Sequence, residues 1–313
     1  GTIQGGDNTS GQSINGSVWG VLRSRNTILV GIADAGPLAL LTVSQAWLPT
    51  FYYREHGMGL SDGGTLMGLL SLSGFVALIT FLCLIEFYEL KKKSGVKPNS
   101  MMGVLMALTI CFIYIQFPNA NGINILISLL LLIIISLFLE MFSVHDEPLS
   151  NIMMTFGGVV YVAGLLGTMI ALRNWDAFNG TRFTMAMIFS VWICDTAAYT
   201  FGTLWGKKKL IERISPKKTV VGFVGGIIGS FVSFYVMNDI GFIQYELDGF
   251  QLILLTCIVG ICGQLGDFVQ SMFKRDAGVK DSGKLLLGHG GVLDRFDSLI
   301  FASPLVFVFV SFL

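Results

Sequence analysis

Charged and polar side chains crowd one short segment near the end of the chain, between residues 264 and 297. Asp267, Ser271 and Lys274 recur at intervals of four and three residues, so a helix would carry them on one face. Carboxylate and hydroxyl oxygens are ligands that Mg²⁺ prefers, and ammonium groups suit phosphate oxygens. This segment therefore indicates a site for a magnesium-bound phosphate compound.

The residues after this helix add further groups that bind cations or phosphate. They are Arg275, Lys280, Asp281, His289, Asp294, Arg295 and Asp297. Gly278 should end the helix, and the run GHGG at 288–291 supplies flexible backbone beside the histidine. The spacing of the two final aspartates places both on one face of the helix that follows.

Asp195 is a second candidate, because it interrupts the otherwise apolar stretch 183–205. Trp192 and Tyr199 share its helical face. A carboxylate at the centre of a membrane costs about 2.5–3.5 kcal/mol on insertion scales, so we expect it to face the interior or a hydrated cavity. The alternative is an aspartate held by a neighbouring helix for packing alone.

A basic loop, GKKKLIERISPKKT at 206–219, is the third candidate. Ser215 and Pro216 mark a turn, and Lys217 and Lys218 stand where the next helix begins. Cations and free N–H groups at a helix start can hold phosphate. The alternative is that the loop only marks one side of a membrane. After it, glycines at 222, 225, 226 and 229 predict close helix packing.

The composition indicates that these segments belong to a membrane protein. Hydrophobic residues make up 53% of the 313, and charged residues only 13%, against about 25% in soluble chains. Long windows with few or no charges predict an all-α polytopic integral membrane protein with about nine transmembrane helices. The predicted spans are 28–48, 65–85, 101–117, 122–139, 152–172, 183–205, 220–237, 250–266 and 298–313.

The basic residues predict the orientation of these spans. Strict alternation places 17 of the 20 lysines and arginines on one side, leaving Arg54, Arg173 and Arg182 opposite. The crowded side should be cytoplasmic, in an inner or plasma membrane, with the candidate site facing the cytoplasm. Residues 1–25 are polar and expected to be flexible, and the five cysteines are expected to be buried apolar groups.

The polar segments resemble those of one enzyme family. The run S-x-F-K-R-x4-K-D-S-G-K from Ser271, followed by G-H-G-G-x-L-D-R-x-D, is similar to the signature of the phosphatidate cytidylyltransferases. The elements D-T-A-A-Y from Asp195 and S-P-K-K-T from Ser215 resemble the same family's other signature region. The resemblance covers residues 80–313, whereas residues 26–79 form a helix pair atypical of the family, and 26–75 resemble a fragment of a major facilitator transporter.

The resemblance implies that CTP and phosphatidate give CDP-diacylglycerol and pyrophosphate, with Mg²⁺ required and a second cation as an option. It implies a homodimer in the lipid bilayer, and no nucleic-acid partner is expected. Asp267 and Asp281 correspond to the metal-site carboxylates. The remaining implied catalytic residues are Lys280, His289 and Arg295. The implied substrate-binding residues are Ser215, Lys217, Lys218, Lys274, Arg275, Asp294 and Asp195.

Three positions depart from the family pattern. Val221 and Gln270 stand where the family usually carries glutamate, and Leu287 stands where it carries proline. Two lost carboxylates put the strength of metal binding in question. Two other functions remain open on the sequence alone. They are a CTP-dependent lipid or polyprenol kinase, which shares a basic nucleotide site, and a membrane transporter, which the number of spans favours.

Overall fold

The computed structural model describes residues 60–116, 122–143, 147–176, 179–283 and 290–313, with side chains given from residue 73 onward except 122–126. The chain divides into two compact units, residues 1–68 and 69–313. The second unit contains the described part of the candidate site. The predicted span 28–48 and the predicted flexible end lie outside the described residues.

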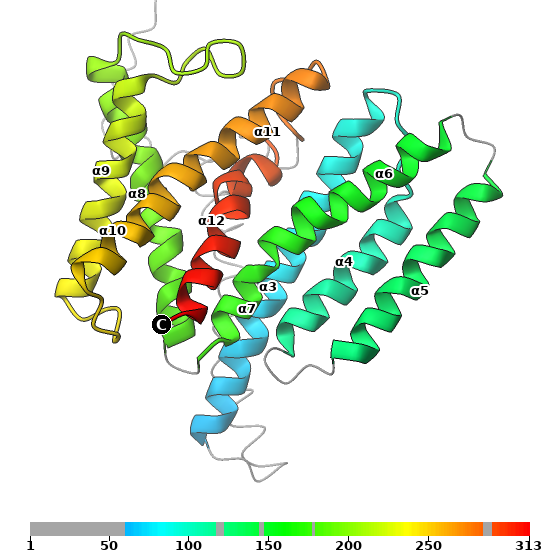
Figure 1. Ribbon diagram of the computed structural model, residues 1–313, viewed down its shortest axis with the longest axis horizontal. Helices are drawn as coiled ribbons and strands as arrows, with labels where there is room; N and C mark the ends of the chain where they lie inside the picture. Colours follow the sequence, from blue (N-terminus) through cyan, green and yellow to red (C-terminus); the bar gives the residue numbers. More distant parts are fainter. Residues whose placement is uncertain (1–59, 117–121, 144–146, 177–178, 284–289) are drawn as a thin grey trace, which may run out of the picture. The chain divides into compact units, whose positions relative to one another are not determined.

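Helices make up the described fold, and no strand occurs among the described residues. Figure 1 shows them coloured along the chain. They are α3 (Leu60–Lys92), α4 (Ser100–Ile115), α5 (Gly122–Met141), α6 (Pro148–Gly158), α7 (Thr168–Asn174), α8 (Asn179–Trp205), α9 (Val220–Asp239), α10 (Gly249–Cys257), α11 (Gln264–Asp276) and α12 (Leu293–Ser311). Two π-helical turns, η1 (Val159–Gly164) and η2 (Ile258–Gly263), interrupt these helices. The prediction of an all-α fold is confirmed.

Five helical segments of the described chain are long and apolar enough to cross a membrane. They are Ser73–Lys92, Pro148–Asn174, Asn179–Trp205, Val220–Asp239 and Gly249–Asp276. Ser100–Ile115 and Ile127–Met141 are apolar but shorter. Each predicted span from 65–85 onward coincides with a helix or with helices joined through a π-helical turn.

Glycines let α8 and α9 pack closely, as their spacing predicted. The Thr219 side chain caps α9 by accepting a hydrogen bond from Gly222 N at 3.1 Å. A Cβ at Gly222 would lie 2.6 Å from the carbonyl oxygen of Ala198, and one at Gly225 would meet the Phe201 ring. Only a residue without a side chain fits these positions, so the backbones of α8 and α9 come into contact.

A glutamine ties α11 to α9 just before the candidate site begins. Gln264 Nε2 donates to the carbonyl oxygens of Gly260 at 2.6 Å and Phe223 at 3.0 Å. A π-helical turn carries one more residue per turn than the ladder of α-helical bonds uses, so side chains commonly satisfy its carbonyls. The bond to Phe223 ties the start of α11, one turn before Asp267, to α9.

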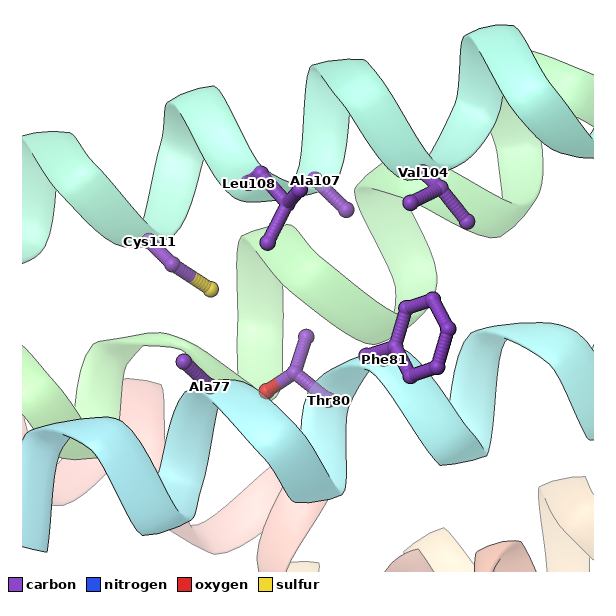
Figure 2. A pocket seen from close by; sticks show the side chains of 7 residues that line it. All are labelled: Ala77, Thr80, Phe81, Val104, Ala107, Leu108 and Cys111. Atoms are coloured by element: carbon purple, nitrogen blue, oxygen red, sulfur yellow. The ribbon is translucent and has the colours of Figure 1, made fainter.

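A narrow apolar gap separates α3 from α4. Figure 2 shows the side chains that face it, Ala77, Thr80 and Phe81 from α3 and Val104, Ala107, Leu108 and Cys111 from α4. The gap has no room for a water-sized molecule. It is a packing gap between two helices, and none of the predicted site residues borders it.

Replacing Gly222 by alanine tests the contact between α8 and α9. The added methyl group would overlap the Ala198 carbonyl oxygen, so G222A should destabilise the protein by about 1–3 kcal/mol. Gly157 in α6 is the matched control, since a Cβ there meets nothing within 4 Å. G157A should be neutral or stabilise by up to about 1 kcal/mol. Thermal unfolding in detergent measures both, and equal midpoints for the two variants would contradict the close contact.

Candidate functional site

Basic residues from α3, from α11 and from the loop before α9 lie near one another at the ends of α3 and α11. Lys91 Nζ, at the end of α3, forms an ion pair with Asp276 Oδ2 at 2.8 Å. Arg275 Nε donates to the carbonyl oxygen of Ile214, in the loop before α9, at 3.3 Å. These contacts bring the predicted basic loop, 206–219, to the same end of α11 as the final basic residues of α3.

Asp267 lies in the first turn of α11, on its polar face. Its Oδ2 pairs with Lys218 Nζ at 2.5 Å, and its Oδ1 accepts a hydrogen bond from Ser271 Oγ at 3.3 Å. The same ammonium group lies 4.5 Å from the centroid of the Phe268 ring. The predicted shared face of Asp267 and Ser271 is confirmed. About 30% of each charged side chain in the pair is exposed, so both charges remain accessible to a ligand.

Two more carboxylates lie within electrostatic range of Asp267. They are Asp195 on α8 and Asp297 on α12. Asp297 is buried, and its Oδ1 accepts a hydrogen bond from Ser298 N at 2.8 Å. Asp195 has an exposed side chain on α8, on the same helical face as the exposed side chains of Trp192 and Tyr199. The three carboxyl groups therefore lie close to one another, with the ammonium groups of Lys218 and Lys274 near them.

Asp294 connects α11 to the segment that follows it. Its Oδ1 accepts from Lys274 Nζ at 2.7 Å, and its Oδ2 accepts from the N–H groups of Ser282 at 2.9 Å and Gly291 at 3.1 Å. Burial alone would raise the pKa of Asp294, but the bond from Lys274 and the two backbone donors outweigh it. The pKa of this carboxyl therefore lies below its ordinary value.

Glu86 on α3 is a site residue that the sequence reasoning missed. Its Oε1 accepts from Val292 N at 2.9 Å, and its Oε2 accepts from Leu293 N at 2.9 Å and Ser282 Oγ at 3.0 Å. The residue is only 8% exposed. The first N–H groups of a helix have no partner within the helix, so this carboxylate satisfies two of them at the start of α12.

Glycines are required where the two ends of the segment 283–290 approach each other. A Cβ at Gly283 would lie 2.5 Å from Glu86 Oε1, and one at Gly291 would lie 2.7 Å from Gly283 N. Gly290 has a φ of +85°, which side chains rarely adopt. Gly283, Gly290 and Gly291 are therefore explained by backbone geometry and by the bulk of the Glu86 carboxylate.

The other predicted site residues border this cluster or lie outside the described chain. Lys280, Asp281, Arg295 and Lys217 are exposed, and Ser215 is half-buried. Asp281 forms no hydrogen bond or ion pair with any described residue, but it directly precedes Ser282. His289 and Leu287 lie outside the described residues. The structure thus brings together Asp267, Lys218, Lys274 and Asp294, and leaves Asp281 at the edge.

Among the departures from the family pattern, Gln270 has the most unusual surroundings. The residue is fully buried, and neither its Oε1 nor its Nε2 has a hydrogen-bond partner among the described residues. Unpaired amide atoms inside a protein carry a cost of about 1–3 kcal/mol. Val221, in contrast, is exposed at the start of α9.

The arrangement fits a magnesium ion that a ligand brings with it. The described residues contain no group of three or more His, Cys, Asp or Glu side chains able to hold a metal ion. Mg²⁺ is commonly held by one or two carboxylates together with substrate phosphates and water. Asp267, with one half-exposed carboxylate and ammonium groups nearby, has the chemistry for such a shared ion.

Replacing Asp294 by asparagine tests its role as an ionised acceptor. D294N should lose about 1–3 kcal/mol of stability at neutral pH, because an amide cannot accept all three bonds. A carboxyl with a lowered pKa stabilises the fold above its unfolded pKa, and this contribution disappears as the pH falls through the folded pKa. The difference in unfolding midpoint between wild type and D294N should therefore shrink below about pH 4. A difference that stays constant from pH 7 to pH 3 would contradict this assignment.

Known proteins are similar in sequence to this chain over most of its length. Residues 59–313 match the cytidylyltransferase family. A phosphatidate cytidylyltransferase of Staphylococcus haemolyticus is 40% identical over 72% of this chain and 85% of its own length. Those of Staphylococcus saprophyticus and Staphylococcus aureus strain COL are 38% and 36% identical, each over 75% of this chain and 90% of the relative. The chain therefore belongs to the cytidylyltransferase family.

Proposed function

We propose that this enzyme transfers the cytidylyl group of CTP to phosphatidate, giving CDP-diacylglycerol and pyrophosphate. The similarity to phosphatidate cytidylyltransferases supports the choice of substrates. The observation that carries the proposal is the joining of two ion pairs, Lys218–Asp267 and Lys274–Asp294, along one helix. They supply ammonium groups that suit phosphate oxygens beside carboxylates that suit a metal ion.

The chemistry requires alignment of two phosphates more than it requires an activated side chain. An oxygen of the phosphatidate phosphate attacks the α-phosphorus of CTP, the new oxygen–phosphorus bond forms, and the bond to the β-phosphate breaks as pyrophosphate leaves. Phosphatidate is already ionised at neutral pH, so no general base is needed. The protein contributes positioning and compensation of charge.

The basic side chains around α11 would hold the phosphates. Lys218 and Lys274 each sit beside a carboxylate, and part of each pair is open to solvent. Lys217, next to Lys218 in the chain, is exposed, and so are Arg275 in the last turn of α11 and Lys280 just after that helix. These five cations can bind the triphosphate of CTP and the lipid phosphate together, because ammonium and guanidinium groups pair with phosphate oxygens. Asp195, Ser215, Arg295 and His289 complete the proposed substrate contacts.

Asp267 and Asp281 would hold Mg²⁺ through their carboxylates. When bound, the ion would neutralise negative charge on the triphosphate and the departing pyrophosphate. Asp267 fits this role through its half-exposed carboxylate, and Asp281 through its exposed carboxylate without a described partner. A second cation is proposed as an option, with the carboxyl oxygens of Asp195 and Asp297 as further ligands near Asp267.

The proposed setting is a multi-pass protein of the inner or plasma membrane with its site at the cytoplasmic surface. The basic residues favour this orientation. About nine spans are proposed, with 28–48 as the first. A homodimer is proposed on the resemblance to the family, and many large apolar side chains exposed on α8 and α9 would suit a partner or lipid.

Labelled CTP distinguishes this reaction from the alternatives. With CTP labelled on the α-phosphate, phosphatidate and Mg²⁺, the purified protein should transfer the label to a lipid and release pyrophosphate. A CTP-dependent lipid kinase would instead release labelled CDP and leave the lipid unlabelled. Transport across vesicles without any change to CTP would support a transporter. Either of these results would overturn the proposal.

Replacing Asp281 by asparagine tests the proposed metal role. D281N should lower lipid labelling by about a hundredfold or more at ordinary Mg²⁺ concentrations, because one carboxylate would be lost from the ion. Asp239 at the end of α9 is the matched control, since it is also an exposed aspartate and shows no described ion pair. D239N should retain full activity. Unchanged labelling by folded D281N would remove Asp281 from the metal site.

A further inference from the structure

Glu86 receives three hydrogen bonds from residues far along the chain. The donors are Ser282 Oγ and the N–H groups of Val292 and Leu293, the last of these 207 positions later. No lysine, arginine or histidine forms an ion pair with Glu86 among the described residues. Its negative charge is therefore balanced by these donors and by the N-terminal dipole of the 19-residue helix α12.

Ser282 is held by two carboxylates at once. Its N–H donates to Asp294 Oδ2 and its hydroxyl donates to Glu86 Oε2. At the other end of the segment 283–290, Gly291 N donates to Asp294 and Val292 N to Glu86. Glu86 and Asp294 therefore hold Ser282 together with residues 291–293, one from α3 and the other from α12.

The contacts of Glu86 and Asp294 determine where several site residues lie. Lys280 and Asp281 come immediately before Ser282, and Asp294 and Arg295 come immediately after the residues that bind Glu86. A change in the Glu86 contacts would move both groups relative to Asp267 on α11. Displacements of about 1 Å in an active site can cost on the order of a hundredfold in rate.

We propose that Glu86 is a positioning residue for cytidylyl transfer, acting through Ser282 and the start of α12. It would act without contacting the substrates, by holding Ser282 beside Val292 and Leu293 so that the residues around them bind the same nucleotide. The inference rests on the proposed function for its effect on activity, but the contacts of Glu86 can be tested without substrates.

The first test replaces Glu86 by glutamine and uses Glu89 as a matched control. An amide of the same size keeps one acceptor and turns an NH₂ group toward backbone N–H donors. E86Q should lower kcat/KM for CTP by about tenfold or more, with a raised KM for CTP. Glu89 lies one turn later on α3, is exposed, and pairs only with Lys92 among the described residues. E89Q should stay within about twofold of wild type.

A double-mutant cycle separates positioning from general stability. S282A removes one bond to Glu86 and should also lower kcat/KM for CTP. Because both changes break the same contact, the E86Q/S282A variant should lose clearly less than the product of the two separate losses. Losses that multiply, or an E86Q enzyme with unchanged kcat/KM, would overturn the proposal. If E86Q fails to fold, S282A alone decides, and wild-type kinetics for that variant would equally overturn it.

Amide hydrogen exchange makes the result independent of the reaction. In E86Q, the amides of Val292 and Leu293 should exchange faster, while those of α9 should be unchanged. If wild-type protein shows no cytidylyl transfer, the proposed function fails, yet faster exchange at these amides still supports the contacts. Unaltered exchange in E86Q would show that Glu86 does not hold the segment.

Discussion

The structure depends on one buried carboxylate that completes the hydrogen bonding of a helix start in another part of the chain. Glu86 on α3 satisfies two N–H groups at the beginning of α12 and the hydroxyl of Ser282. An ionised group in an apolar setting is tolerated only when donors surround it, and here the donors come from the very segment that carries the candidate site. The same hydrogen bonds therefore stabilise the packing of α3 against α12 and determine the geometry of the site.

The acidic residues of the site divide into roles according to their burial. Glu86 and Asp294 are largely enclosed and accept several bonds each, so they organise backbone. Asp267 is half-exposed and shares its charge with one ammonium group, so it can exchange that partner for a ligand. Asp281 is exposed and has no described partner. The degree of burial therefore separates the carboxylates that organise the backbone of the site from those that are available to bind a substrate.

Patterns in the sequence predicted the helices and the signature residues, because apolar length and helical spacing are local properties. The shared face of Asp267 and Ser271 and the glycine packing of α9 followed from spacing alone. Glu86 could not be found this way. Its partners are mostly backbone N–H groups, which leave no mark in a sequence, and it looks the same as the exposed Glu89 one turn later. The exposure of Asp195 likewise depends on which neighbours cover α8, and the unpaired amide of Gln270 on how tightly α11 is enclosed.

The distance along the chain between Glu86 and its donors has a consequence for biosynthesis. Val292 follows Glu86 by 206 residues, so at about 5–20 residues per second the ribosome needs roughly 10–40 s to produce this donor. During that interval α3 carries a carboxylate without its native donors close to the end of an apolar segment. This group must therefore stay hydrated or find other donors during synthesis, and it gains its native bonds only after the start of α12 has been made.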